Sequence, residues 1–288
     1  MRTQGYPVQP ELIPPPSRLQ ISPVEMAPAT RTGIPQYLPY PEFCRLIDQL
    51  LMPCELQLQG SGDPLLHLHF FQMVRYAVDR GMRVTTTTPL CILPQYRAVE
   101  CLQSGLGTLY IALDAATPET YCRLYGKDKL AKVLRNVQRL VDVRRSDNGN
   151  GLRLFLASLV SRDNLAELPS LVQLAHDARL DGMILQLAGS TAGESPFHAM
   201  RTVSSKHDLR NEDPDRVTFF LMCAQSRAQA LGIDLHLPAS CRPTPPTVLP
   251  ESRPARRNYL AADGSLLPCR RTVFRGDRTG DLPALGTA

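Results

Sequence analysis

The residues with the clearest chemical potential are Gly62, Asp63 and Pro64, which directly follow a short strand predicted at Glu55–Gln59. Glycine and proline favour a turn, and Asp63 adds a carboxylate to it. In parallel α/β sheets and barrels, ligands bind at the mouth formed by the carboxyl ends of the strands. The turn therefore predicts a ligand-binding position with a negative charge. The simpler interpretation, a connection that only joins strand to helix, stays open.

Further polar residues follow the same rule, because each stands at or just beyond the carboxyl end of a later predicted strand. These residues are Thr88, Asp114, Ser158, Arg162 and Gln186. Each could contact a ligand at the mouth or could cap its own loop, and the sequence leaves both interpretations open. After Thr88, Pro89 removes a backbone donor, so we expect fewer polar contacts there.

The elements that must position these residues alternate between strand and helix. Short β-rich segments are predicted at 19–21, 55–59, 82–86, 108–113, 152–160 and 183–187. Segments with apolar residues at helical spacing begin at Pro41, Leu65, Pro94, Leu130, Asn164 and Asp213. Asn164 and Glu167 have the spacing of a capping box. Right-handed crossovers between parallel strands would curl such units into a partial barrel or a doubly wound sheet.

Composition limits the other classes of function. The chain has 288 residues and a net charge of +5, which is mild for this length, so nucleic acid is not an expected partner. There is no apolar run of membrane-spanning length and no export-signal pattern, so we expect a cytoplasmic location without membrane association. The eight cysteines form no CxxC pair and are expected to be reduced.

Proline content divides the chain into three predicted parts. Residues 1–18 are a proline-rich, disordered lead-in, and residues 19–237 form the barrel. Residues 238–288 are a small loop-rich tail with many arginines, which could bind an acidic partner or simply be solvated. Asp263-Gly264 predicts a tight hairpin turn inside this tail.

Residues 55–187 resemble the radical SAM superfamily. The resemblance is carried by LQLQGSGDPLLH, RGMRVTTTT, SGLGTLYIALDAATPETYCRLYG, KVLRNVQRLV, LASLVSRDNLAELPSLVQLA and DGMILQ, in this order. It implies a partial (β/α)6 TIM-type barrel with a small loop-rich C-terminal extension. It also implies that the Gly62-Asp63-Pro64 turn holds the amino group of S-adenosylmethionine, with ribose, carboxylate or adenine contacts from Thr88, Asp114, Ser158, Arg162 and Gln186.

The tail adds a second resemblance. NYLAADGSLLPC, at 258–269, is similar to the hairpin before a cysteine in the SPASM extension, which holds auxiliary clusters in peptide- and cofactor-maturing members of the superfamily. The resemblance suggests Cys241 and Cys269 as metal ligands. They make an incomplete set, because four thiolates usually hold a [4Fe–4S] cluster.

One departure from the superfamily decides the predicted mechanism. Its enzymes carry CxxxCxxC after the first strand, where three thiolates hold a [4Fe–4S] cluster whose open iron binds S-adenosylmethionine. The corresponding segment here, SPVEMAPATRTGIPQYLPYPEF at 22–43, contains no cysteine, and only Cys91 lies at the carboxyl end of a predicted strand. His67 and His69, two residues apart on a predicted helix, point away from each other and are expected at the surface.

Three functions stay open. The first is a cluster-deficient paralogue whose barrel binds a peptide substrate or an S-adenosylmethionine-like ligand and works with an intact radical SAM partner protein. The second is an active radical SAM enzyme with an unusually supplied cluster, which would cleave S-adenosylmethionine to a 5′-deoxyadenosyl radical for peptide or cofactor maturation. The third is a chain without activity.

Overall fold

The computed structural model describes most of the chain between residues 18 and 237 and two short segments beyond it. The described residues are 18–25, 36–50, 55–60, 62–146, 151–187, 209, 212–237, 258–260 and 266–267. Residues 1–17 of the predicted lead-in at 1–18, the tail arginines, and Cys241 and Cys269 lie outside these residues, whereas Arg18 is described and begins a strand. The three-part domain division therefore stays a prediction.

The described strands and helices alternate through the barrel. The strands are β1 (Arg18–Ile21), β2 (Val24–Glu25), β3 (Gln36–Tyr37), β4 (Glu55–Leu58), β5 (Arg83–Thr88), β6 (Thr108–Ala112), β7 (Arg153–Val160), β8 (Gly182–Leu187), β9 (Asp234–His236), β10 (Asn258–Leu260) and β11 (Leu266–Leu267). The α-helices are α1 (Tyr40–Asp48), α2 (Phe70–Val78), α3 (Gln95–Gln103), α4 (Pro118–Tyr125), α5 (Leu130–Ser146), α6 (Leu168–Asp177) and α7 (Pro214–Leu231). Short 3₁₀ turns are η2 (Pro64–Leu66) and η3 (Leu165–Glu167).

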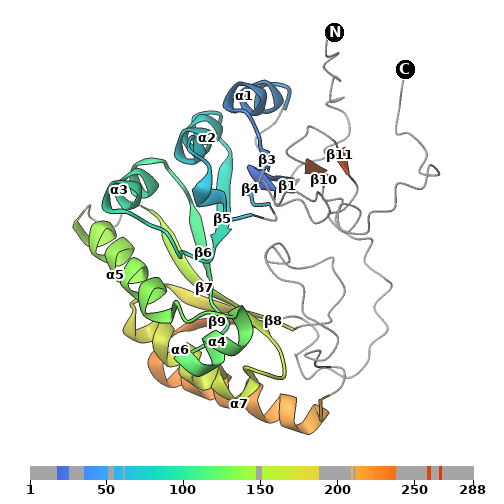
Figure 1. The fold of residues 1–288 in the computed structure, drawn as a ribbon, viewed down its shortest axis with the longest axis vertical. Helices are drawn as coiled ribbons and strands as arrows, with labels where there is room; N and C mark the ends of the chain where they lie inside the picture. The colour runs from blue at the N-terminus through green and yellow to red at the C-terminus, as the bar shows by residue number, and fades with distance from the viewer. Residues whose placement is uncertain are drawn as a thin grey trace, which may run out of the picture.

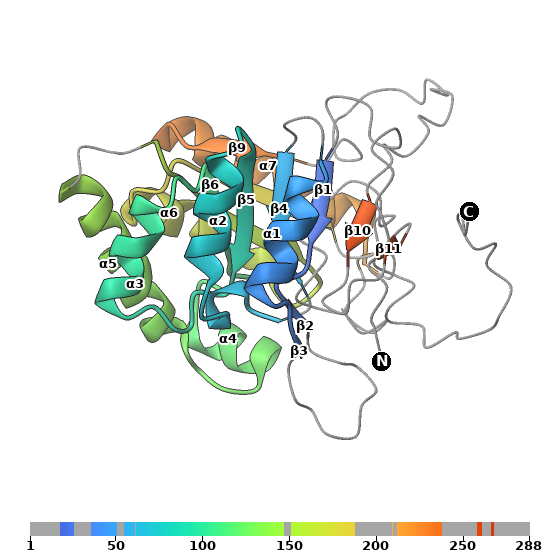
Figure 2. The same cartoon turned by 90° about the horizontal axis from the view of Figure 1, so that it is seen from above.

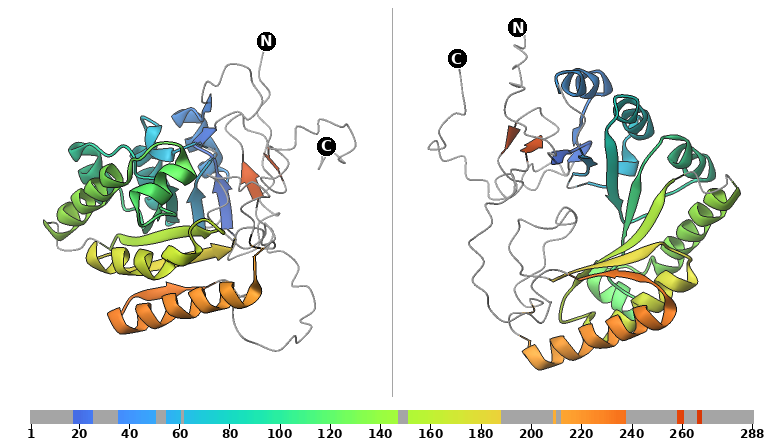
Figure 3. Two further views of the ribbon diagram at one scale, coloured as in Figure 1. Left: turned by 60° about the horizontal axis from the view of Figure 1, so that its bottom comes forward. Right: turned by 180° about the vertical axis from the view of Figure 1, so that it is seen from behind.

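The main sheet has the order β11-β10-β1-β4-β5-β6-β7-β8-β9. Every neighbouring pair is parallel except β10 and β11. Figure 1 shows the sheet as an open arc with the helices on its convex side, and Figure 3 shows the same arc from behind. Since β9 and β11 stand at opposite edges and are not paired with each other, the sheet is not closed. This confirms the predicted partial barrel.

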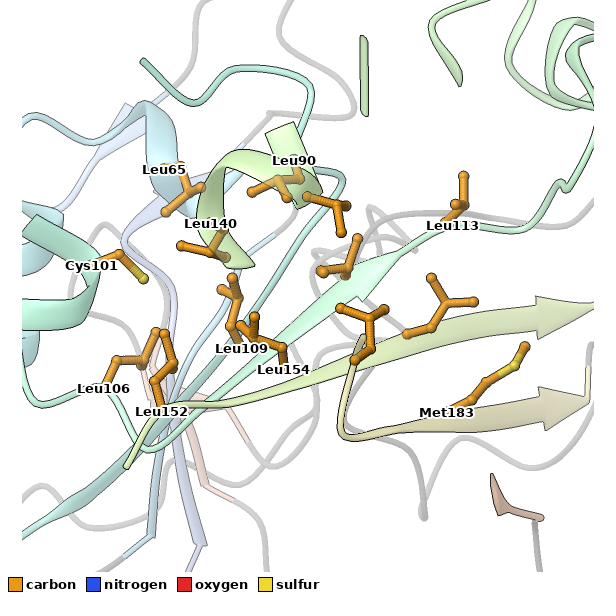
Figure 4. Close-up of a cluster of buried hydrophobic side chains, with 14 of the residues drawn as sticks. Leu65, Leu90, Cys101, Leu106, Leu109, Leu113, Leu140, Leu152, Leu154 and Met183 are labelled. Carbon is orange, nitrogen blue, oxygen red and sulfur yellow. The ribbon is translucent and has the colours of Figure 1, made fainter. Parts of the chain in front are cut away.

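The main hydrophobic core lies between the sheet and the helices. One face of β1 and of β4 to β8 supplies apolar side chains, such as Leu56, Leu109 and Leu154, that are fully buried or nearly so. Leu140 of α5 packs into the same cluster, which Figure 4 shows at the junction of helix and strands. The period-2 alternation of the strands leaves their other face toward the concave side.

The α2 region differs from its prediction, because the helix begins at Phe70 rather than at Leu65. The carbonyl groups of Leu65 and His67 accept hydrogen bonds from the Arg97 guanidinium, at 2.9 and 3.1 Å. These carbonyls are thus bonded to a side chain of α3, and the chain makes only the short turn η2 before α2 starts. The surface assignment of His67 was also wrong, since its ring is buried and its Nε2 lies 2.9 Å from the Leu38 carbonyl.

Other local predictions were also wrong. No strand was predicted between residues 23 and 41, but this segment contains β2 and β3, which pair antiparallel, and β9 was not predicted either. These strands of two or three residues are too short to show a periodic pattern. Asn164 and Glu167 form no capping box, because Asn164 makes no side-chain cap and Glu167 accepts hydrogen bonds from Ala116 N and Thr117 Oγ1.

The antiparallel strands of the predicted tail hairpin are confirmed as β10 and β11, whereas the predicted turn at Asp263-Gly264 lies outside the described residues. The hairpin also has a place that the sequence did not predict. β10 pairs in parallel with β1, so that Leu19 lies opposite Asn258, and the hairpin extends the main sheet (Figure 2).

Among the described helices, none combines the length and the apolar character that a membrane crossing requires.

Candidate functional site

The concave side of the sheet carries a polar surface, which we call the inner face. Its side chains alternate with the core residues along β1, β4, β5 and β6. They are Gln20, Gln57, Gln59, Thr85, Thr87, Thr108 and Tyr110. Gln57 Nε2 donates to Gln59 Oε1 at 2.7 Å, as expected for residues two apart on one face. This surface was not predicted from the sequence, although the LQLQ pattern at 56–59 indicates alternating apolar and polar faces.

Asp63 lies in the turn after β4, where it caps the short turn η2. Its Oδ1 accepts hydrogen bonds from Leu65 N at 3.1 Å and from Thr88 Oγ1 at 2.8 Å. Burial raises the pKa of this carboxyl group to about 6, although both hydrogen bonds and Arg97 act in the opposite direction. Within the described part of the chain, Oδ2 has no hydrogen-bond partner. The structure thus joins two predicted site residues, Asp63 and Thr88, from neighbouring strands.

Thr88 is held in place by the turn that follows β5. Its Oγ1 accepts from Leu90 N at 3.0 Å while the hydroxyl group donates to Asp63. Leu90 has a φ of +53°, an unfavourable value for a leucine, and its carbonyl accepts from Asn136 Nδ2 of α5 at 2.8 Å. Strained backbone of this kind persists where surrounding contacts enforce it, often near functional sites. Asn136 was not predicted as a site residue, since a single asparagine in a helix gives no signal.

The turn around Asp63 rests against the segment that follows β1. Gln59 N donates to Ile21 O at 2.9 Å, and Gly62 N donates to Val24 O at 3.1 Å. A Cβ on Gly60 would lie 2.1 Å from the Val24 carbonyl oxygen, so only glycine allows this approach. Gln59, Gly60 and Gly62 thus pack closely against residues 21–24, which support the turn that carries Asp63.

Asp114 has a different environment, although it also stands at a strand end. Its Oδ1 accepts from Leu159 N at 2.7 Å, and its Oδ2 accepts from Tyr125 Oη at 2.8 Å. Asn164 Nδ2 donates to the carbonyl groups of Asp114 and Leu159, at 2.8 and 3.0 Å. Both carboxylate oxygens are therefore occupied, because Oδ1 ties the end of β6 to β7 and Oδ2 is bonded to Tyr125 of α4.

The remaining predicted residues are spread over different surroundings. Ser158 is buried and lies opposite the core residue Leu185 in the sheet register, so it belongs to the face of the sheet that packs against the helices. The side chain of Arg162 forms an ion pair with Glu212, at 3.0 Å. Gln186 is buried on the inner-face alternation of β8. Only Gln186 of these three shares a sheet face with the inner-face residues.

The residues present do not fit a [4Fe–4S] cluster. The described part of the chain contains no group of three or more His, Cys, Asp or Glu side chains arranged to hold a metal. In the sequence, the segment 22–43 that would supply the ligands has no cysteine. Cys91, at the end of β5, has its Sγ 3.8 Å from Tyr121 Oη.

Comparisons with known proteins agree with the geometry. No protein-family model matches the chain. A tungsten-containing aldehyde ferredoxin oxidoreductase cofactor-modifying protein from Pyrococcus furiosus is 22% identical over 149 residues, which are 51% of this chain and 42% of the relative. The chain therefore spans less than half of that curated relative.

Solved structures show the fold more completely. SuiB of Streptococcus suis matches with a TM-score of 0.63 and 12% identity over 91% of this chain and 62% of SuiB. SuiB has also been solved with S-adenosylmethionine and with the precursor peptide SuiA. The anSMEcpe structure with bound AdoMet has a TM-score of 0.63 and 13% identity over 88% of this chain and 74% of its own. The fold is therefore the open, radical-SAM-like partial barrel.

Proposed function

We propose that this chain binds S-adenosylmethionine, or a ligand with the same positively charged amino group, at Asp63, without holding a [4Fe–4S] cluster on its own cysteines. The observation that carries the proposal is the environment of Asp63. A half-buried carboxylate at the carboxyl ends of parallel strands keeps one oxygen without a partner among the described residues. A ligand ammonium group would supply the missing charge partner.

The chemistry of the turn fits such a ligand. At neutral pH the Asp63 carboxyl group is mostly ionised, since its pKa is raised only to about 6. Thr88 and the Leu65 amide occupy Oδ1 and leave Oδ2 for an incoming donor. The S-adenosylmethionine complexes of SuiB and anSMEcpe, which share the fold, support this choice of ligand.

The other predicted site residues contribute to the proposed binding site to different degrees. Gly62 and Pro64 shape the turn, and Gln186 shares the inner-face side of the sheet. We do not place Asp114 in contact with the ligand, because both of its carboxylate oxygens already accept hydrogen bonds. Its role in the proposal is to hold β6 and β7 in position. Ser158 and Arg162 contribute least, since one lies on the helix-facing side and the other pairs with Glu212.

The wider role that we propose is that of a binding partner in peptide or cofactor maturation. The peptide complexes of SuiB and anSMEcpe support a peptide as the second ligand. An intact radical SAM enzyme would then perform the chemistry that requires a cluster. The alternative is an active radical SAM enzyme with an unusually supplied cluster. Iron and sulfide analysis after anaerobic reconstitution separates the two, because about four irons per chain would favour the alternative.

Isothermal titration calorimetry tests the binding site directly. We expect S-adenosylmethionine and S-adenosylhomocysteine to bind, and 5′-methylthioadenosine, which lacks the amino group, to bind at least tenfold more weakly, about 1.4 kcal/mol. Asp63→Asn should remove most of this preference while keeping the shape of the turn. Equal binding of all three ligands to both proteins, or no binding of any, would refute the role of Asp63.

A further inference from the structure

Two neighbouring polar side chains on the inner face each bury an atom that has no hydrogen-bond partner among the described residues. Gln59 and Thr87 are both fully buried. Gln59 Nε2 and Thr87 Oγ1 nevertheless make no hydrogen bond within the part of the chain that the structure describes. Most buried polar atoms in native proteins are paired, because an unmet group loses its bonds to water without replacement. Two such groups in one place therefore require an explanation.

The strand register places the two groups side by side. Gln57 of β4 lies opposite Thr85 of β5, so Gln59 and Thr87, each two residues further along, share the next position of the same face. On the other side, Thr87 lies opposite Tyr110 of β6. The unpaired amide and hydroxyl groups thus belong to adjacent strands on the concave side of the sheet.

The hydrogen bonds around Gln59 show which of its side-chain atoms lacks a partner among the described residues. Its Oε1 accepts from Gln57 Nε2 at 2.7 Å, and its backbone carbonyl accepts from Gln20 Nε2 at 3.0 Å. The N–H groups of Gln59 are therefore the free donors. Thr87 adds a hydroxyl group, which can donate or accept. Together they offer a donor beside an acceptor.

The charge of the surroundings selects the chemistry of a ligand. The neighbouring inner-face residues Gln57, Thr85 and Tyr110 are uncharged. The charged residues of the same rows, Glu55 and Arg83, lie at the opposite end of the strands and face each other at 4.0 Å. A charged group bound between Gln59 and Thr87 would lose water without gaining a countercharge, which is unfavourable.

We propose that Gln59 and Thr87 form a subsite for an uncharged amide group of a ligand. The amide carbonyl accepts from Gln59 Nε2, and the amide N–H donates to Thr87 Oγ1. This subsite does not depend on the proposed binding at Asp63. Its ligand can present either a secondary amide, as in a peptide backbone, or a primary amide, as in an asparagine or glutamine side chain.

Thermal unfolding of two valine variants tests whether the Thr87 hydroxyl group is unpaired in the protein. Thr86 and Thr87 are adjacent and both fully buried, but Thr86 Oγ1 donates to Leu58 O at 2.6 Å. We expect Thr86→Val to lower Tm by about 2–4 °C. Thr87→Val should leave Tm unchanged or raise it. An equal loss of Tm in both variants would overturn the proposal, because it would show a structural partner for Thr87.

Methyl NMR titration tests the ligand chemistry at the same position. With threonine methyl groups labelled, N-methylacetamide should shift the Thr87 resonance, whereas sodium acetate and methylammonium should not. Acetamide in place of N-methylacetamide distinguishes primary from secondary amides. The Thr86 methyl group is the internal control. No Thr87 shift with either amide, or equal shifts with the charged probes, would refute the subsite.

A second variant separates this proposal from the one at Asp63. Gln59→Met should abolish the amide-induced shift of Thr87 while leaving the calorimetric preference for S-adenosylmethionine over 5′-methylthioadenosine unchanged. Asp63→Asn should do the reverse. Loss of both responses in the single variant Gln59→Met, with its Tm unchanged, would contradict two independent subsites.

Discussion

Asp63 and Asp114 are two aspartates at the mouth of the same barrel, and their surroundings are opposite. Both oxygens of Asp114 accept hydrogen bonds, one from the β7 backbone and one from Tyr125. Asp63 uses only Oδ1 for two donors, and burial raises its pKa to about 6. The position at a strand end is therefore shared, whereas the capacity to take up a ligand is not. The hydrogen-bond partners distinguish a structural carboxylate from one available for binding.

The largest expected effect concerns the backbone that supports Asp63. Gly60→Ala would place a Cβ 2.0 Å from Ser22 Oγ and 2.1 Å from Val24 O. We expect this variant to lower the free energy of unfolding by about 3 kcal/mol, because the Val24 backbone must move. Chemical denaturation measures it. The matched control is Gly107→Ala, whose Cβ would lie 3.3 Å from Val84 O, and an equal loss there would contradict the close-packed junction.

The next effect concerns the structural carboxylate. Asp114→Ala removes the acceptor for Leu159 N and for Tyr125 Oη, so we expect a loss of about 2 kcal/mol in the free energy of unfolding. Tyr125→Phe removes only the second bond and should cost about 1 kcal/mol. Urea denaturation of both variants gives these values. If Asp114→Ala were as stable as the wild type, the comparison between the two aspartates would fail.

A pH series tests the opposite character of Asp63. A carboxyl group whose pKa is raised by folding binds its proton more tightly in the native state, so its contribution to stability falls as pH rises between 3.8 and about 6. Asp63→Asn cannot ionise. The Tm difference between this variant and the wild type should therefore be small below pH 3.8, increase in favour of the variant through that window, and stay constant above it.

Asp48→Asn is the control for this series, because folding lowers the pKa of Asp48 whereas it raises the pKa of Asp63. Hydrogen bonds from Tyr76 and Arg80 hold the pKa of Asp48 below its usual value. Wild-type stability from this group is present above its unfolded pKa and is lost as pH falls through the folded value. Asp48→Asn should thus be less stable than the wild type at neutral pH. The same pH trend in both variants would show that the Asp63 environment is wrongly described.

The smallest expected effect concerns the single hydrogen bond between Thr88 and Asp63. Thr88→Val removes the donor to Asp63 Oδ1 and the acceptor for Leu90 N. The pKa of Asp63 should then rise further, since one of the contacts that lower it is lost. Carboxyl-detected NMR titration of Asp63 measures the change. An unchanged pKa would mean that Thr88 does not bond to the carboxylate in solution.

The sequence predicted the barrel better than it predicted the site. Hydrophobic periodicity and glycine stops located most parallel strands and the helices around them, because both patterns depend on local chain geometry. Hydrogen-bond partners distant in the chain do not leave such a pattern. Asp114 was therefore predicted as a ligand contact beside Asp63, although both of its oxygens are bonded within the protein. The contact between His67 and Leu38 that buries the histidine could not be foreseen either. The LQLQ pattern at 56–59 indicates one apolar and one polar face, but the polar face could be assigned to the concave side only from the structure.

The pairing of β10 with β1 has a consequence for the order in which the molecule is built. Leu19 forms its sheet pair with Asn258, far along the chain. A ribosome adds roughly 5–20 residues each second, so β1 is synthesised roughly 10–50 s before its second neighbour. During that time the strand can pair with β4 alone, and its other edge offers free backbone groups to any extended segment nearby. The pairing between β1 and β10 is therefore the slowest to form, and the growing chain is most open to wrong partners at β1.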